Sequence, residues 1–175
     1  MPRRAARGGP PLPIATSPGG GPGVAVAELL DAAAAPLKLD LAAGRAGLEH
    51  RVHLARVQRP GLALTGYVDY IRYGRVQIVG SSEVGYLRKL PTRRRSAILD
   101  KLCRCRITCF VVTKGLVPPP ELLQAAEGRG IPVLTTPLES TGFIKLLSAF
   151  LEERLATRLH LHSVLLDVFG LGVLI

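Results

Sequence analysis

Polar residues follow two predicted strands in the second half of the chain, where they could bind an anion or a small molecule. Thr113, Lys114 and Gly115 come directly after "ITCFVV", and Thr135 lies near the end of "IPVLTT". Ser140 begins a long amphipathic segment and can cap it as a helix. Hydroxyls, a lysine and free helix amides are groups that accept phosphate or carboxylate oxygens. The same residue types also make ordinary caps and turns, so both interpretations stay open.

One histidine and three cysteines could take part in other chemistry. His162 opens "HSVLLDVFGLGVLI", a hydrophobic run typical of a strand, where a single histidine is more often structural than catalytic. Cys103, Cys105 and Cys109 have C-x-C-x3-C spacing, which differs from the paired cysteines of zinc sites. We therefore expect structural thiols and no metal site.

The elements that must position these groups alternate between strand and helix. Strands are predicted at 75–80, 107–112 and 131–136, and helices at 81–90, 92–105, 121–130 and 140–156. This order predicts an α/β fold with a small parallel or mixed sheet and flanking helices. Ligands of such sheets bind at the carboxyl ends of the strands, which is where the polar candidates fall. Residues 1–23 are rich in Pro and Gly, and we expect them to be a disordered tail.

The formal net charge of +10, from 23 basic and 13 acidic residues, would suit a polyanionic partner. The basic residues are scattered, however, and aromatic residues do not alternate with them as stacking platforms for nucleic acid would. We therefore do not expect nucleic-acid binding. No segment has the roughly 18 apolar residues of a membrane span, and the N-terminus lacks the apolar core of a secretory signal. The protein is predicted to be cytoplasmic, without a membrane partner.

Four segments of the chain resemble, in order, the N-terminal region of bacterial HPr kinase/phosphorylase. They are "RPGLALTGYVDYIRYGRVQIVGSSEVGYL", "FVVTKGLVPPPELLQAAEGRGIPVLTT", "FIKLLSAFLEERLA" and "HSVLLDVFGLGVLI". The N-terminal domain of that family is similar to the first domain of the Mur ligases, which implies a small α/β fold. Residues 112–147 also resemble the DRTGG module, an accessory domain found beside catalytic domains.

The resemblance implies a function for the intact enzyme. In this family, phosphate passes between ATP or pyrophosphate and a serine of the phosphocarrier protein HPr, with magnesium, in the regulation of carbon metabolism. The family is hexameric, and His162 matches a histidine regarded as part of its active site. A homo-oligomer is therefore possible for this chain.

The family's last strand leads into a phosphate-binding loop ending in Gly-Lys-Ser, and no such loop occurs in this sequence. We therefore expect residues 24–154 to be the N-terminal domain and 155–175 to be a linker and the first strand of a kinase domain. This chain alone is expected to be inactive, with no cofactor of its own. The alternative is a stand-alone, DRTGG-like ligand-sensing module without catalysis.

Overall fold

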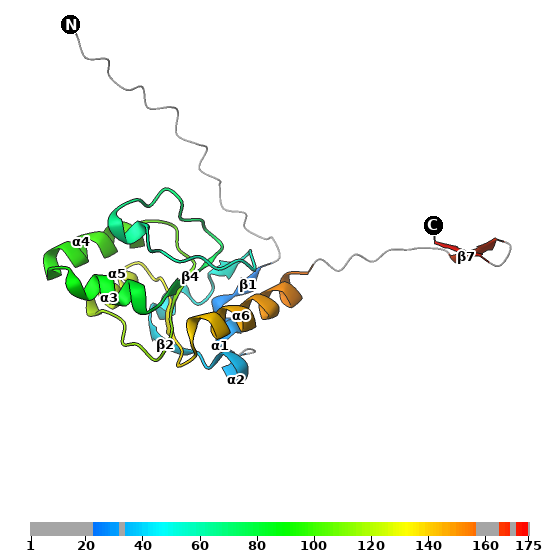
Figure 1. Cartoon of the computed structure of the whole chain (residues 1–175), viewed down its shortest axis with the longest axis horizontal. Helices are drawn as coiled ribbons and strands as arrows, with labels where there is room; N and C mark the ends of the chain where they lie inside the picture. Colours follow the sequence, from blue (N-terminus) through cyan, green and yellow to red (C-terminus); the bar gives the residue numbers. More distant parts are fainter. Residues whose placement is uncertain (1–22, 32–33, 157–164, 169–170, 175) are drawn as a thin grey trace, which may run out of the picture.

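A mixed four-stranded sheet forms the centre of the structure, a computed structural model that describes residues 23–31, 34–156, 165–168 and 171–174. Its strands lie in the order β2-β6-β5-β4, and β2, at one edge, runs antiparallel to β6. The four strands are β2 (Asp40–Ala43), β4 (Val76–Val79), β5 (Cys109–Val112) and β6 (Val133–Thr135). The predicted α/β class with a mixed sheet is confirmed (Figure 1).

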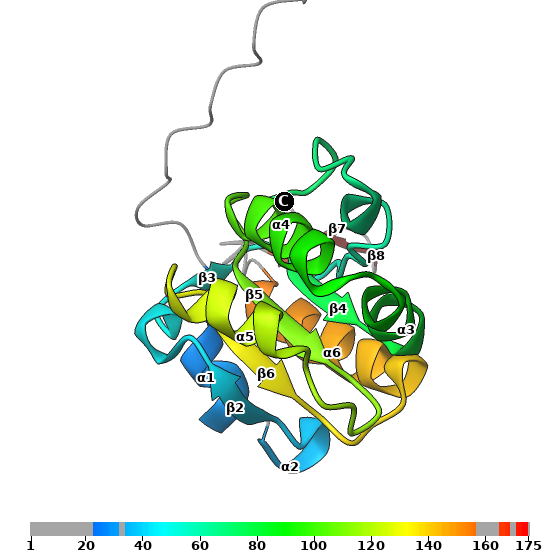
Figure 2. The same cartoon turned by 90° about the vertical axis from the view of Figure 1, so that its left-hand side faces the viewer.

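Helices cover both faces of this sheet (Figure 2). One face carries α3 (Ser81–Lys89), α4 (Thr92–Cys103) and α5 (Pro120–Glu127), and the other carries α1 (Val26–Asp31) and α6 (Ser140–Leu155). All four residues of β5 are buried, and successive side chains pack on opposite faces of the sheet: Cys109 and Val111 lie in the core with α1 and α6, whereas Phe110 and Val112 pack with α3, α4 and α5. This double coverage explains why β5 is a continuous apolar run and not an alternating one.

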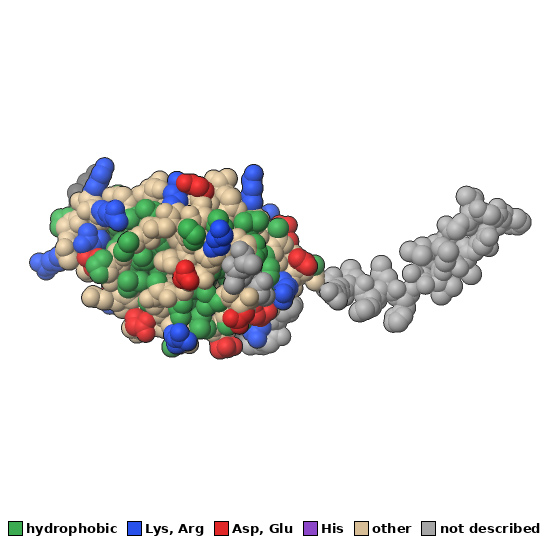
Figure 3. Space-filling view, turned by 90° about the horizontal axis from the view of Figure 1, so that it is seen from below, with side chains coloured by type: hydrophobic (Ala, Val, Ile, Leu, Met, Phe, Trp, Pro, Cys, Tyr) green, Lys and Arg blue, Asp and Glu red, His purple; other side chains and the backbone are tan. Residues whose placement is uncertain are grey.

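Short elements complete the described part of the chain. They are β1 (Val24–Ala25), α2 (Ala34–Leu37), the 3₁₀ helix η1 (Arg45–Gly47), β3 (Arg51–Val52) and the 3₁₀ helix η2 (Ala63–Thr65). β1 and β3 pair antiparallel, and a parallel bridge from Gln58 to Gln77 covers the outer edge of β4. Figure 3 shows Lys and Arg side chains spread over this face of the molecule, several of them at the end that α3 and α4 form.

Two further strands, β7 (Leu165–Val168) and β8 (Leu171–Leu174), pair antiparallel with Leu165 opposite Leu174. The structure therefore describes two short strands in the stretch that the sequence suggested as one. The assignment of 155–175 to a linker and a kinase-domain strand stays a prediction. Residues 1–22 and His162 lie outside the described residues.

Candidate site at the carboxyl edge of the sheet

The carboxyl ends of β4, β5 and β6 meet at one edge of the sheet, and the five predicted ligand residues lie there. Thr113, Lys114 and Gly115 follow β5, and Thr135 pairs in register with Val112 at the end of β6. Ser140 begins α6 beside them. The predicted order of strands and helices thus placed these residues correctly at one edge of the sheet. Their role as ligands stays a prediction.

Thr113 and Ser140 bind each other. Their hydroxyl oxygens are 2.6 Å apart, and both residues are buried. Ser140 therefore does not cap α6, as its sequence position suggested: the N-cap residue is Glu139, which makes no side-chain capping bond. The two hydroxyls join the end of β5 to the start of α6, because a hydroxyl this deeply buried needs a partner inside the protein.

We expect Thr113→Val to lower the free energy of unfolding by about 1–3 kcal/mol, because it leaves the buried Ser140 hydroxyl without a partner. Ser140→Ala should have a similar effect through Thr113. The double variant should cost less than the sum of the two single losses, since neither hydroxyl is then left unpaired. Urea unfolding of the four proteins measures this coupling, and strictly additive losses would show that the hydroxyls do not depend on each other.

The backbone of the loop after β5 also bonds inward. Lys114 and Gly115 both have left-handed backbone conformations, with φ of 67° and 61°. Their amides donate to the carbonyl oxygens of Leu138 and Thr136, at 2.8 and 2.9 Å. The Lys114 ammonium forms an exposed ion pair with Glu139, with Nζ and Oε2 2.8 Å apart. These amides hold two loops together and are not directed at a ligand.

The N-terminus of α3, at the same edge, is filled by a carboxylate of the chain itself. Glu83 is 6% exposed, and its Oε2 accepts a hydrogen bond of 2.9 Å from the amide of Gly80. The residue before α3 is this glycine, which has extended backbone angles. Since a negative charge already lies at the positive end of the helix dipole, a second anion would be repelled there.

An open hollow of about 420 Å³ lies beside these loops. Its lining comes from β2, from the loop after β5 and from the end of β6, and consists of Asp40, Gly115, Leu116, Val117, Pro118, Thr135, Thr136 and Pro137. Gly115 and Thr135 are thus the two predicted residues that reach the hollow. The lining contains one carboxylate and no lysine or arginine, so it suits a neutral or cationic group with apolar surface.

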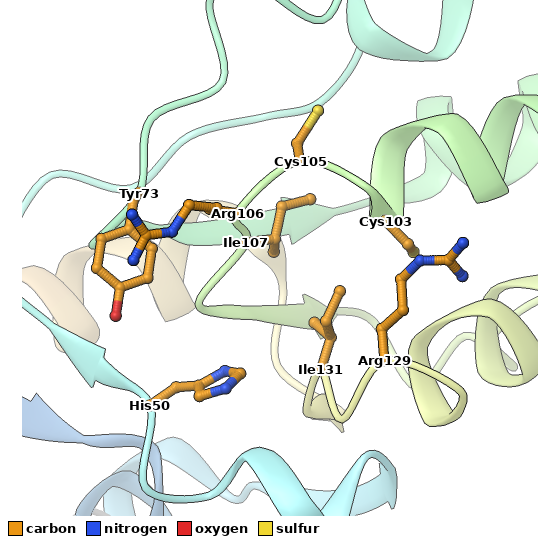
Figure 4. A pocket seen from close by; sticks show the side chains of 8 residues that line it. All are labelled: His50, Tyr73, Cys103, Cys105, Arg106, Ile107, Arg129 and Ile131. Atoms are coloured by element: carbon orange, nitrogen blue, oxygen red, sulfur yellow. The ribbon is translucent and has the colours of Figure 1, made fainter. Parts of the chain in front are cut away.

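A second pocket, of about 240 Å³, lies at the opposite edge, near the amino ends of β5 and β6 (Figure 4). No residue of this pocket was predicted as a ligand from the sequence. Four segments distant in sequence line it, and its residues are His50, Tyr73, Cys103, Cys105, Arg106, Ile107, Arg129 and Ile131. Two arginines and a histidine make it the more basic of the two pockets described here.

The cysteines near this pocket are structural in character. Burial raises the pKa of the Cys103 and Cys109 thiols to about 12, and it also raises the pKa of Cys105. Thiols with raised pKa values stay protonated near neutral pH and are poor nucleophiles and metal ligands. Among the described residues, no three His, Cys, Asp or Glu side chains are grouped closely enough to hold a metal ion.

These features define a class of protein: a three-layer α/β domain in which polar groups at the strand ends bond mainly to one another. The described part of the chain contains no helix long and apolar enough to cross a membrane. A similar fold occurs in the crystal structure of the CBS and DRTGG domains of the regulatory region of Clostridium perfringens pyrophosphatase, solved with its activator diadenosine tetraphosphate. The TM-score is 0.50 at 21% identity, and the match covers 72% of this chain and 48% of that one.

The family model for the HPr Serine kinase N terminus matches residues 24–151, and the chain belongs to this family. HPr kinase/phosphorylase of Geobacter sulfurreducens is 49% identical over 152 residues, which are 87% of this chain and 48% of that protein. HPr kinase/phosphorylase of Latilactobacillus sakei is 41% identical over 140 residues, or 79% and 45% of the two chains. The chain thus spans about half the length of these relatives. The resemblance noted from the sequence is confirmed.

Proposed function

We propose that this chain is the N-terminal regulatory or assembly region of an HPr serine kinase/phosphorylase. The observation that carries the proposal is the family match over residues 24–151, in a chain that spans about half the length of its relatives. In the intact enzyme, a catalytic half would transfer phosphate between ATP or pyrophosphate and a serine of HPr, with magnesium bound at the phosphates. His162 would act in that catalytic half, and the enzyme would work in the cytoplasm as a homo-oligomer.

The chemistry of the carboxyl edge supports a non-catalytic role for the region described. Phosphoryl transfer needs backbone amides and cations aimed at phosphate oxygens. Here the amides of Lys114 and Gly115 bond to carbonyl oxygens, and Glu83 occupies the start of α3. The nearby hollow includes the carboxylate of Asp40, which would repel phosphates.

An exchange of N-terminal segments between this chain and a relative tests the proposal. In a hybrid protein, residues 24–151 of this chain would replace the matching segment of the Geobacter relative. ATP-dependent phosphorylation of HPr would then be measured for the hybrid and for the isolated chain. We expect the isolated chain to transfer no phosphate and the hybrid to phosphorylate HPr at the relative's own rate, because the region supplies packing and assembly while the other half supplies the chemistry. The relative without its N-terminal segment is the control, and its oligomeric mass is compared with the hybrid's by light scattering.

A second candidate function is a ligand-sensing module that acts without catalysis. The DRTGG-like fold and the hollow of about 420 Å³ at the strand ends favour it. The same exchange separates the two candidates. If the hybrid folds but neither assembles nor phosphorylates HPr, the region does not belong to the kinase assembly and the sensing module is favoured. Phosphate transfer to HPr by the isolated chain would contradict both.

A further inference from the structure

A carboxylate and a hydroxyl lie side by side in the hollow at the carboxyl edge of the sheet. Asp40 of β2 and Thr135 of β6 are direct partners in the antiparallel pair, and both line the hollow. Side chains of such cross-strand partners point to the same side of a sheet, with Cβ atoms about 4.5–5.5 Å apart. The two side chains are thus placed to contact one ligand group together.

These two groups are not used inside the protein. In the part of the chain that the structure describes, no hydrogen bond or ion pair engages the Asp40 carboxylate or the Thr135 hydroxyl. The neighbouring polar groups differ in this respect. The Thr136 hydroxyl donates to the carbonyl oxygen of Leu37 at 2.7 Å, and the Lys114 ammonium is paired with Glu139. The polar groups left for a ligand are therefore hydrogen-bond acceptors with a negative charge.

Three consecutive prolines remove the amides that would favour an anion at this edge. Pro118 and Pro119 lead into α5, and Pro120 is its first residue. Proline has no N–H group, so the start of α5 lacks donors with which a helix N-terminus usually binds a phosphate. Glu121 adds a negative charge in the first turn of the same helix. The hollow therefore favours a cation over an anion.

The rest of the lining is apolar and determines the kind of cation. Leu116, Val117, Pro118 and Pro137 provide an apolar wall, and Val117 is 71% exposed. An aliphatic ligand body would remove this surface from water. Among the described residues that line the hollow, none is aromatic, so it lacks the ring faces that hold a quaternary ammonium. A cation bound here must donate through its own N–H groups, as a primary ammonium does.

We propose that this hollow binds a small primary amine, with the ammonium group at Asp40 and Thr135 and an aliphatic body on Val117. At about 420 Å³ the hollow lies within the roughly 300–1,000 Å³ that is usual for small-molecule sites. The proposal names a ligand class for the ligand-sensing candidate and rests on it, because both require that the hollow takes a ligand. The kinase proposal does not depend on it.

The experiment uses the whole chain and four probes that share a five-carbon body: pentylamine, pentyltrimethylammonium, pentanol and pentanoate. Binding is measured by titration with amide chemical-shift mapping at pH 7. We expect pentylamine to shift amides in 40–43, 115–117 and 135–136. It should bind about fivefold more tightly than pentanol, the size of effect that an ion pair at an exposed site provides, and added salt should reduce this advantage. Pentyltrimethylammonium should bind less tightly than pentylamine because it has no N–H donor, and pentanoate least tightly because Asp40 repels it.

Variants separate the charged group from the apolar wall. Asp40→Asn should lower the affinity for pentylamine to about that for pentanol and leave pentanol binding unchanged, and it should retain the fold because Asp40 is exposed. Asp69→Asn, which removes an exposed carboxylate from the loop before β4, makes the same change in net charge and should bind like the unaltered chain. Val117→Ser should weaken pentylamine and pentanol by a similar factor, because it removes apolar surface that both would cover.

Three results would overturn the proposal. If pentanol or pentanoate binds these residues as tightly as pentylamine, the ligand is not an amine, although the hollow remains a ligand site and the ligand-sensing candidate stands. If Asp40→Asn and Asp69→Asn weaken binding equally, the amine follows the net charge of the chain and not this site. If no probe shifts these amides, the hollow takes no such ligand. None of these results bears on the kinase proposal, which the hybrid protein tests separately.

Discussion

Replacing Gly47 by alanine is expected to unfold the domain. An added Cβ would lie 1.8 Å from the carbonyl oxygen of Gly130 and 2.7 Å from Cδ of Pro132. Both neighbours belong to the turn that leads into β6, so neither can move away without disturbing the sheet. We expect a loss of more than about 4 kcal/mol in the free energy of unfolding. Single substitutions cause losses of this size when they create severe clashes or disrupt the core.

Two helical glycines provide the controls for this substitution. A Cβ added to Gly85 in α3 or Gly142 in α6 would meet no atom within 4 Å beyond its chain neighbours and the backbone of its own helix. Alanine there should be neutral or should raise stability by up to about 1 kcal/mol, because it favours the helix. Thermal unfolding followed by circular dichroism measures all three variants. A Gly47→Ala protein that melts with the unaltered chain would show that this close approach does not constrain the fold.

The contact of Gly47 with Gly130 illustrates what the sequence could and could not predict. The parallel strands and most of the helices were predictable, because the apolar runs and the Gly and Pro stops are local patterns. The edge strand β2 places Asp40 opposite Thr135, a pairing between residues far apart in the chain. No local pattern contains that pairing, so the carboxylate in the hollow was not foreseen.

The bonding of the predicted ligand residues was hidden from the sequence for a similar reason. The residue types at Thr113 and Ser140 are equally suited to a ligand, a cap or each other. Only the packing of α6 against β5 brings the two hydroxyls to 2.6 Å. The amino-edge pocket was not predicted, because ligands of parallel sheets usually bind at the opposite edge, where the carboxyl ends of the strands lie. Its two arginines are also far apart in the sequence.

Removing Glu121 is the second substitution with a large expected effect. Glu121, near the start of α5, forms an ion pair with Arg95 of α4, and the side chains are only 9% and 18% exposed. Arg95 also donates to the carbonyl oxygen of Leu87 at the end of α3, so the pair connects three helices. We expect Glu121→Ala to cost about 2–4 kcal/mol, because it leaves the mostly buried guanidinium without its counter-charge. Replacing both partners, by Arg95→Met with Glu121→Leu, should recover much of that loss, since no charge is then buried.

This pair also makes a prediction about pH. The hydrogen bond from Arg95 lowers the pKa of Glu121 below its usual 4.5, against the opposing effect of desolvation. A carboxyl group whose pKa is lower in the folded state stabilises that state above its unfolded pKa, and the contribution is lost as the pH falls through the folded pKa. The stability difference between the unaltered chain and Glu121→Ala should therefore be full at pH 7 and should shrink below pH 4.5. Urea unfolding at a series of pH values measures this stability difference. Asp100→Ala is the control, because it removes a half-buried carboxylate at the other end of α4, and a smaller loss is expected there. A difference that grows as the pH falls would mean that the paired carboxylate does not stabilise the fold.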